Sequence, residues 1–448
     1  MDMPDQNTGA GRNIHTPLLH AQPRPGSRRG GASPRKAFVL LIKAFVGSGM
    51  LFLPRAFSNG GLLFSALILV LVAAASLYTM QQLVHCHLRQ ETDAVSGSGA
   101  YGILAQKAYG RWMRRAVEFS TVASQLGFSC AGSVFVATSL RDAFNAMTSC
   151  RWSTELPIGF WIVAQALPLA PLCLIRHVRG FSKVALFADA GIILGLVYVL
   201  ASSTNSLAHY GPGPNVQLFN SSSFSLFLGS ATYTFEGYAL ILPISSAMRR
   251  PKKFPRLLML VMAICAALAV AIGSIGYMAF GDTTEPIILL NMPPRSVATQ
   301  IVRAVYALAI VGTTPLMMFP AYKLIERPMF RDVSGKQFLR VKAGKSAFCL
   351  VMLAAVLFVA HVGAERLDRL VAIIGGAACV PLAFVYPPLI HMRLGASASQ
   401  SCYQRFCDLL FALLGIALSM YVTAGAIKRW GAIETPYDFC QVQIPHVA

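Results

Sequence analysis

Residues 45–61 read FVGSGMLFLPRAFSNGG and lie in an apolar segment long enough to enter a lipid bilayer, yet glycine and proline interrupt it. In lipid, every backbone N–H and C=O group needs an internal partner. An unwound turn at membrane depth is therefore stable only where it lines a cavity or meets a ligand. This predicts that Gly47, Ser48 and Gly49 form part of a binding site within the membrane.

The composition places most of the chain in a membrane. Its 448 residues are 55% hydrophobic and only 12% charged, and the mean hydropathy is +0.57, far from the values of a soluble domain. A transmembrane helix needs about 20 apolar residues. Roughly eleven such windows follow one another, at residues 37–57, 62–86, 115–140, 157–175, 181–203, 223–248, 255–280, 296–325, 344–360, 367–390 and 406–428. We therefore predict an all-α, polytopic membrane protein.

The positions of the basic residues that give the formal net charge of +20 are explained by membrane topology. About 28 of the 38 Lys and Arg residues fall in the N-terminal tail and in alternate loops, which all lie on one side if the window count is right. The positive-inside rule makes this side and the N-terminus cytoplasmic, and an odd number of spans puts the C-terminus across the membrane. Orientation thus accounts for the basic residues, and we expect no nucleic-acid partner.

The sequence divides into three parts. Residues 1–36 are rich in Pro, Gly, Arg and Ser and predict a disordered cytoplasmic tail, residues 37–430 form the transmembrane domain, and residues 431–448 form a non-cytoplasmic tail. We expect the first window to act as an uncleaved anchor. Most of the ten cysteines lie in or beside apolar windows, and we interpret them as packing residues without metal-ligand spacing. Cys150 and Cys440 are a candidate disulfide on the non-cytoplasmic side, and Asn220 begins a glycosylation sequon there.

A second window carries the same kind of interruption. Residues 230–248 read SATYTFEGYALILPISSAM, with a Glu-Gly pair inside the window and Pro243 six residues after it. In the first window Pro54 follows Gly49 by five residues. If windows one to five and six to ten form an inverted repeat, the interrupted helices are the first of each half, where transporters of that design bind substrate. The eleventh helix is then an addition.

This geometry suits a free amino acid, which carries opposite charges on adjacent atoms. The N–H groups and positive dipole end of one half-helix receive a carboxylate. Carbonyl groups at the end of the other half accept ammonium protons. No fixed charged side chain is required, and Gly47 and Gly49 allow the backbone to approach the ligand closely.

Glu236 is the leading ionisable candidate, because a carboxyl group within a span is energetically costly and marks a functional site by default. It either carries a proton or contacts the substrate ammonium, or it is a neutral group that stabilises the unwound backbone. Asp189 and Arg303 are interpreted as members of structural ion pairs. We expect the hydroxyl groups of Thr313 and Thr314 to make hydrogen bonds between helices, and they are also candidate ligands for a coupling cation or the substrate.

Several blocks, in order, resemble the amino acid/auxin permease family, and especially its fungal and protist vacuolar amino acid exporters. Besides residues 41–61 they are YGRWM (109–113), SQLGFSC (124–130), TFEGYALILP (234–243), MRRPKKFP (248–255), GYMAFGD (276–282), TPLMMFPA (314–321) and CVPLAFVYPPLIH (379–391). The resemblance covers residues 37–393. It implies an eleven-helix carrier of the LeuT-like (APC) fold, a 5+5 inverted repeat plus one helix, that moves amino acids, commonly with protons.

The resemblance also assigns site residues. It implies that Gly47, Ser48 and Gly49 bind the backbone groups of the substrate, facing Phe235, Glu236 and Gly237, with Gln125 nearby. Proton-coupled animal relatives carry a His three residues before the first-helix Lys, whereas this chain has Leu40 before Lys43. Since that His is absent here, the transported proton is carried either by Glu236 or by no fixed side chain.

Taken together, the sequence predicts a monomeric secondary active transporter of mainly neutral amino acids. We expect proton coupling, with sodium as the alternative ion, no organic cofactor, and export from an acidic lumen such as the vacuole to the cytosol. The alternatives are an amino-acid sensor that binds but barely transports, and a plasma-membrane uptake carrier. No nucleophile elbow, phosphate loop or zinc motif is present, so we expect no enzymatic activity.

Overall fold

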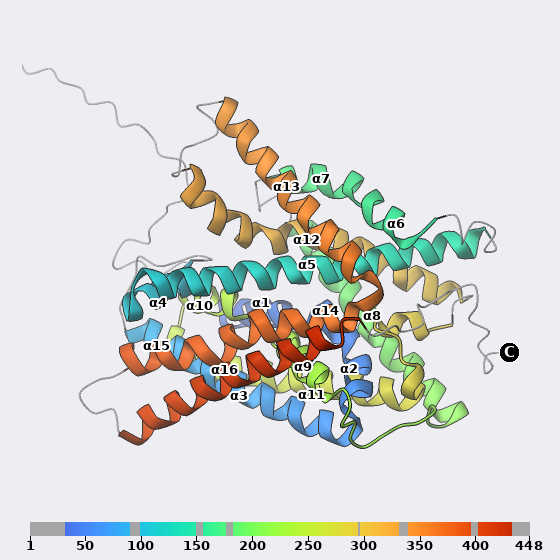
Figure 1. Ribbon diagram of the computed structural model, residues 1–448, viewed down its shortest axis with the longest axis horizontal. Helices are drawn as coiled ribbons and strands as arrows, with labels where there is room; N and C mark the ends of the chain where they lie inside the picture. The colour runs from blue at the N-terminus through green and yellow to red at the C-terminus, as the bar shows by residue number, and fades with distance from the viewer. Residues whose placement is uncertain are drawn as a thin grey trace, which may run out of the picture.

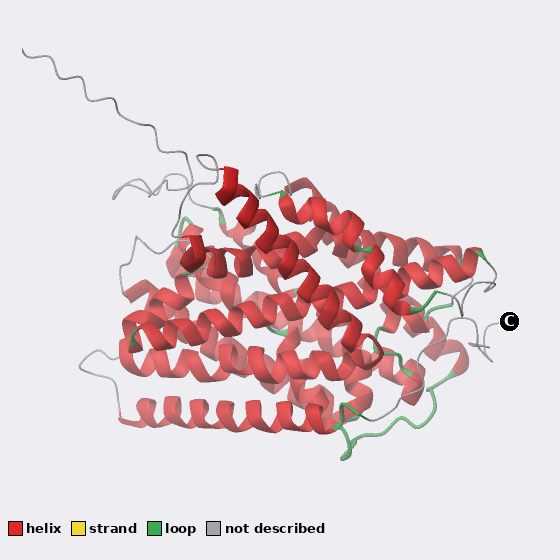
Figure 2. Ribbon diagram, turned by 45° about the horizontal axis from the view of Figure 1, so that its top comes forward, coloured by secondary structure: helices red, strands yellow, loops and turns green. Residues whose placement is uncertain are grey.

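The regular elements of the computed structural model are all helices (Figures 1 and 2). It describes residues 32–89, 99–148, 156–175, 182–293, 296–330, 339–395 and 402–431. The helices are α1 (Pro34–Phe45), α2 (Leu53–Gly60), α3 (Leu62–Arg89), α4 (Ala100–Tyr109), α5 (Arg111–Met147), α6 (Ile158–Ala164), α7 (Ala166–Leu174), α8 (Ser182–Tyr210), α9 (Phe224–Thr234), α10 (Tyr238–Ala247), α11 (Phe254–Phe280), α12 (Val297–Phe330), α13 (Leu339–Gly363), α14 (Leu367–Ile374), α15 (Tyr386–Leu394) and α16 (Cys402–Lys428). Short 3₁₀ turns include η2 (Ser48–Phe52), η4 (Pro251–Lys253), η5 (Gly281–Thr283), η6 (Ile288–Asn291) and η7 (Ala364–Arg366), and two π-helical turns, η8 (Gly375–Cys379) and η9 (Pro381–Val385), precede α15.

Each predicted window coincides with helical structure, but not always with one helix. Within the described residues, eight helical stretches are long and apolar enough to cross a membrane. The longest, Arg340–Leu394, has 55 residues and contains two of the predicted windows, which meet at η7. The window at 157–175 is the shorter apolar stretch Ile158–Leu174, and the window at 223–248 is divided into α9 and α10. The count of eleven spans and the inverted repeat remain predictions.

One helix was not expected. α4 lies between the second and third windows and packs against α5, α10 and α15. The hydroxyl group of its buried Tyr101 donates to the carbonyl oxygen of Leu382 at 2.9 Å. This carbonyl belongs to η9, where π-helical geometry replaces the regular α-helical ladder. A ten-residue segment is too short to register as a span, and contacts with other helices hold it in place.

The core is built around two helices that connect many others. The long helix α5 crosses the molecule and packs against α12, α13 and α6 (Figure 1). The short helix α9 lies among α2, α14 and α16. Its contact with α14 is unusually close, because a Cβ atom added at Gly229 would lie 2.6 Å from the carbonyl oxygen of Ala372. Only glycine permits this approach of two backbones.

Two ion pairs involve charged residues inside the predicted spans. Asp189 of α8 pairs with Lys43 of α1. Arg303 of α12 pairs with Asp142 of α5, with Nη1 of the arginine 3.2 Å from Oδ2 of the aspartate. The interpretation of Asp189 and Arg303 as members of structural pairs is confirmed, and each pair joins two helices that are distant in sequence.

The two ends of the described chain lie at opposite ends of the bundle. Ala32, just before α1, exchanges backbone hydrogen bonds with the end of α10, from Ala32 N–H to Ala247 O and from Arg249 N–H to Ala32 O. Beyond α16, the ring of Trp430 lies 5.8 Å from the guanidinium carbon of Arg366, next to the start of α14. Ala32 and Trp430 are therefore separated by the length of the helices.

Other sequence expectations have mixed outcomes. Six cysteines in or beside the spans are free and buried, which confirms their packing role; they are Cys86, Cys130, Cys173, Cys265, Cys349 and Cys379. Cys150 and Cys440 lie outside the described residues, as do residues 1–31 of the predicted tail and residues 432–448. The side-chain amide of Asn220 donates to the carbonyl oxygen of Ser58 at 3.1 Å, so a glycan on this nitrogen would disturb the contact.

Candidate functional site

The first predicted interruption is a break between α1 and α2. The last α-helical turn ends with the N–H of Val46 bonded to the carbonyl of Ile42 at 2.7 Å, and Gly47 is extended with φ −137°. The 3₁₀ turn η2 follows, and α2 starts at Leu53 with Pro54 in its first turn. Gly47, Ser48 and Gly49 thus lie where helical bonding is interrupted, as the sequence predicted.

The second interruption is a break between α9 and α10. α9 ends at Thr234, and Phe235, Glu236 and Gly237 connect it to α10, which starts at Tyr238. The N–H of Glu236 reaches the carbonyl oxygen of Tyr233 at 3.4 Å, a poor hydrogen bond. All three predicted residues of this segment therefore lie in the break.

The two breaks face each other. A Cβ atom added at Gly49 would lie 3.3 Å from Cε1 of Tyr233, and one added at Gly237 would lie 2.6 Å from Cε1 of Phe45. Each break thus touches the helix that enters the other. The ring of Tyr233 also packs edge-on against Phe128 of α5, with ring centroids 4.5 Å apart. These contacts place α5 beside the junction of the two broken helices.

Glu236 is the ionisable group at this junction. Its side chain is buried, with 8% exposure, and its Oε1 atom has no hydrogen-bond partner among the residues that the structure describes. The phenol groups of Tyr101, Tyr233 and Tyr238 and the thiol of Cys379 lie within electrostatic range of it. A buried carboxyl oxygen without a partner is energetically costly, and such groups in a native fold call for a functional explanation.

Two of these phenols are held differently. The hydroxyl group of Tyr238 exchanges a 2.8 Å hydrogen bond with Thr79 of α3 and also donates to the carbonyl of Ser76 at 3.2 Å. The hydroxyl group of Tyr233, in contrast, is buried and has no hydrogen-bond partner within the described part of the chain. Glu236 and Tyr233 therefore supply two polar groups at the breaks with unused hydrogen-bonding capacity.

Gln125 is on the wall of this region. It is 8% exposed and lies three residues before Phe128 on α5, so the two side chains share one face of the helix. Because Phe128 touches Tyr233, Gln125 faces the same junction one turn along α5. Gln125 thus shares a helix face with a residue that touches the end of α9, and its contact with the substrate stays a prediction.

Thr313 and Thr314 have a different role from the expected contact between helices. Their hydroxyl groups donate to carbonyls of their own helix α12, Thr313 to Ala309 at 2.9 Å and Thr314 to Ile310 at 2.8 Å. Hydroxyl groups in apolar helices commonly donate a hydrogen bond to the backbone carbonyl one turn earlier in the same helix. The expectation of hydrogen bonds between helices is therefore wrong for these two groups, and their use as cation ligands stays a prediction.

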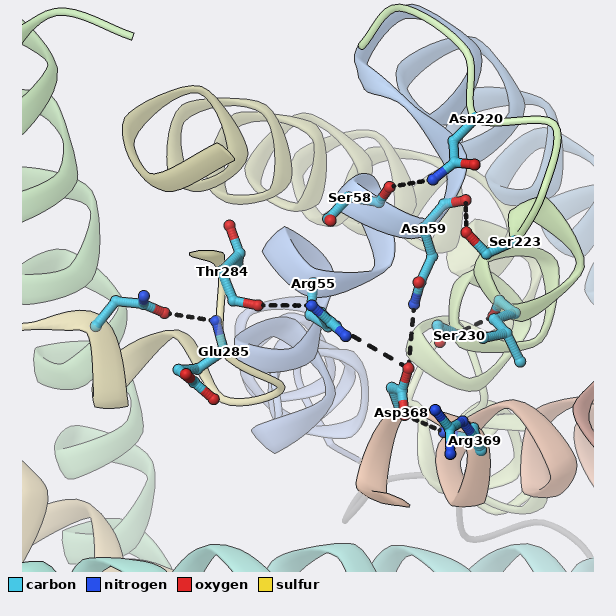
Figure 3. Close-up of polar contacts among 12 residues, drawn as sticks. Arg55, Ser58, Asn59, Asn220, Ser223, Ser230, Thr284, Glu285, Asp368 and Arg369 are labelled. Carbon is cyan, nitrogen blue, oxygen red and sulfur yellow. Dashed lines mark hydrogen bonds and ion pairs between the residues drawn. The ribbon is translucent and has the colours of Figure 1, made fainter. Parts of the chain in front are cut away.

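Sequence reasoning missed a polar cluster on α2, one turn beyond the first break (Figure 3). Nη1 of Arg55 donates to the carbonyl oxygen of Thr284 at 3.2 Å, and Nε of Arg55 lies 4.0 Å from Oδ2 of Asp368 on α14. Nearby, Asn59 donates its side-chain amide to Asp368 at 3.5 Å. A charged residue within the first apolar window was a signal in its own right.

The comparisons with known proteins agree on one family. A sequence profile described as "Transmembrane amino acid transporter protein" matches residues 30–428. The chain is 38% identical over 411 residues to Vacuolar amino acid transporter 3 of Saccharomyces cerevisiae and 36% identical over 397 residues to Vacuolar amino acid transporter 3 of Schizosaccharomyces pombe. The matches cover 90% and 88% of this chain. In both cases this chain spans 58% of the relative's length.

A solved structure, MhsT in complex with L-phenylalanine, aligns with 88% of this chain and 98% of its own, at 14% identity and a TM-score of 0.48. A likeness at this level carries no argument about the site.

Proposed function

The chain belongs to the family of transmembrane amino acid transporter proteins, and from this premise we propose that it is a secondary active transporter that carries mainly neutral amino acids by alternating access. The observation that carries the proposal is the meeting of two broken helices at Gly49, Tyr233 and Gly237, with the buried and unpaired Oε1 atom of Glu236 beside them. The family consists of transporters, and this chain is accordingly not an enzyme.

The geometry supports binding of a zwitterion at the breaks. The carbonyl ends of α1 and α9 carry partial negative charge, and the N–H ends of the helices that follow, beginning at Ser48 and Tyr238, carry partial positive charge. An ammonium group suits the first kind of end and a carboxylate the second. Gly47 and Gly49 keep the backbone accessible, and Gln125 offers an amide beside the second break.

We assign proton coupling to Glu236. It is the carboxyl group at the junction, and a proton gained or lost there would change how well the site holds an ammonium group. Sodium is the alternative coupling ion, and Thr313 and Thr314 are the hydroxyl groups proposed to bind it after leaving their backbone partners.

The membrane and direction follow from the relatives and from the charge pattern. The two yeast relatives named above are called vacuolar, which supports placement in a vacuolar membrane. The basic loops support a cytoplasmic N-terminus. With an acidic lumen, proton symport moves amino acids from the lumen to the cytosol.

Uptake by proteoliposomes tests the proposal. Purified protein is reconstituted, and a panel of amino acids is offered with and without an imposed pH gradient. We expect neutral amino acids to accumulate with the gradient, and little net accumulation without it. Binding with no accumulation under either condition would favour a sensor over a transporter, and accumulation driven by a sodium gradient alone would reassign the coupling ion. Fluorescence localisation of the tagged protein distinguishes vacuolar export from plasma-membrane uptake.

A further inference from the structure

Exposed basic side chains gather at the end of the bundle where α1, α10 and α11 meet. α1 and α11 begin there and α10 ends there, and α1 packs against both of the other helices. The side chains belong to the first turn of α1, the residues after α10, the η4 turn and the first turn of α11. We call this set the basic patch; its members are Arg35, Lys36, Arg249, Arg250, Lys252, Lys253 and Arg256.

Backbone hydrogen bonds hold the two sides of the basic patch together. Ala32, just before α1, donates its N–H to the carbonyl of Ala247 at 2.8 Å and accepts from the N–H of Arg249 at 2.9 Å. The first turn of α1 therefore lies beside the residues that follow α10. Since α1 and α10 each belong to one of the two broken helices, the basic patch connects both of them at the end away from the breaks.

The positive charge of the basic patch has no acidic partner within the described part of the chain. On the same predicted side of the membrane, Arg114 of α5 pairs with Glu118 at 2.7 Å. The sequence explains the difference, because residues 6–90 and 237–281 contain no Asp or Glu. Membrane orientation accounts for basic residues on this side, but not for a concentration of them without any acidic neighbour.

Such a group of solvated cations attracts a polyvalent anion, because the cations repel one another and share one potential. The N-terminal ends of α1 and α11 add partial positive charge, and neither helix has an acidic residue in its first turn. Groups of about four to eight Lys and Arg residues at the cytoplasmic ends of membrane helices are typical of sites for phosphorylated lipid headgroups. With the cytoplasmic N-terminus proposed above, the basic patch faces the cytoplasmic leaflet.

We propose that the basic patch binds the headgroup of a phosphorylated inositol lipid in the cytoplasmic leaflet. Phosphate groups on the inositol ring accept charge-assisted hydrogen bonds from the first turn of α1 and from the residues that follow α10. One headgroup thereby contacts both sides of the basic patch and ties together one half of each broken helix. The site is separate from the breaks, and its occupancy does not depend on the proposed transport function.

The chemistry of the headgroup sets a preference among anionic lipids. Each phosphate monoester carries about 1.5 to 2 negative charges at neutral pH, so an inositol ring with two of them presents a high charge at two points. Phosphatidylserine has a single net negative charge and offers no second phosphate to the other side of the basic patch. We therefore expect preference for the inositol lipid even when the total charge of the two lipids is matched.

Fluorescence anisotropy with the full-length protein, purified in a non-ionic detergent, tests the proposal. The probe is a fluorescent short-chain phosphatidylinositol bisphosphate. The competitors are phosphatidylserine at matched total charge and the same bisphosphorylated inositol without acyl chains. We expect each competitor to displace the probe at least tenfold less effectively than unlabelled phosphatidylinositol bisphosphate does.

Variants test the two sides of the basic patch separately. Arg35→Gln/Lys36→Gln and Arg249→Gln/Arg250→Gln should each weaken binding of the probe about tenfold or more, since each removes two cations from the site. Arg249→Lys/Arg250→Lys should retain most of the affinity, because lysine also binds phosphate as a point charge. Full binding after neutralisation of either side would overturn a headgroup that bridges α1 and α10.

The matched control is Arg111→Gln/Arg115→Gln, which neutralises two exposed arginines near the start of α5, outside the basic patch. It should bind the probe as the wild type does, and an equal loss in this control would reduce the effect to total charge. Equal displacement by phosphatidylserine, or by the inositol without acyl chains, would overturn the lipid site. Thermal unfolding checks that each variant is folded, and Lys252→Gln/Lys253→Gln replaces Arg249→Gln/Arg250→Gln if the latter unfolds.

Discussion

At the scale of single residues, a substitution at Gly49 tests whether the break needs open space beside its backbone, without changing any charged or polar group. The Cβ of a valine there would lie 3.3 Å from the ring of Tyr233, and the two further methyl groups have no room without moving a buried ring. We expect Gly49→Val to lower proteoliposome uptake at least tenfold while the protein still inserts and purifies as a folded species.

The control for this variant is Gly431→Val, because a Cβ atom at Gly431 meets no atom within 4 Å. It should leave uptake unchanged. Transport by Gly49→Val at the wild-type rate would place the substrate elsewhere.

A substitution at Glu236 distinguishes coupling to the proton gradient from binding of the amino acid. Replacing its carboxyl group by an amide keeps the size and removes the exchangeable charge, so Glu236→Gln should reduce gradient-driven uptake several-fold more than amino acid exchange without a gradient. Both are measured in the same proteoliposomes. Glu118→Gln is the matched control, because Glu118 pairs with Arg114 on the partly exposed surface of α5, at 2.7 Å. Equal loss of both activities in Glu236→Gln would indicate a structural role for the carboxyl group.

At the scale of elements, the pair Arg303–Asp142 joins α12 to α5 and to the η6 turn. Removing Arg303 takes away the ion pair between helices from the fully buried carboxylate of Asp142, while Arg141 stays 3.7 Å from it, and we expect Arg303→Met to lower the free energy of unfolding by up to about 3–5 kcal/mol. The double variant Arg303→Met/Asp142→Leu should recover part of this loss. Thermal unfolding of the purified protein measures both. A double variant less stable than the single one would argue against a cost that arises from the unpaired charge.

The close crossing of α9 with the end of α14 depends on glycine residues, which have no side chain. A Cβ atom at Gly375 would collide with the carbonyl oxygen of Gly229, and backbone atoms offer no side-chain rotation to relieve the contact. Gly375→Ala should therefore destabilise the protein by about 1–3 kcal/mol. Ala377→Val, on the exposed side of the same turn, should have little effect on the unfolding temperature. A normal unfolding temperature for Gly375→Ala would show that the two helices can separate freely.

At the scale of the whole molecule, the positions of Ala32 and Trp430 at opposite ends of the bundle fit an odd number of membrane crossings. We expect a tag at the N-terminus to be accessible to protease from the cytoplasmic side of sealed vesicles and a tag at the C-terminus to be protected. Protection of both tags, or of neither, would contradict the predicted topology.

Much of this architecture was predictable, because membrane helices are specified by local composition. The windows at 62–86 and 255–280 match α3 and α11 closely, since a continuous apolar run in lipid has no competing structure. The breaks at Gly47 and Glu236 were also visible, because glycine and proline act on their own segment. The helix α4 and the back-bonded hydroxyl groups of Thr313 and Thr314 were not predicted correctly, since each is decided by neighbours.

The sequence by itself determined that the chain crosses a membrane repeatedly, that two helices are interrupted, and that Glu236 lies in one interruption, because these properties belong to single segments and to their transfer into lipid. Only the tertiary structure decided that the interruptions meet at Tyr233, that Arg303 is tightly bound, and that Asp368 stands beside Arg55. These facts depend on contacts between residues up to about three hundred positions apart. Such contacts are determined by how the helices pack, and a local sequence pattern does not predict them.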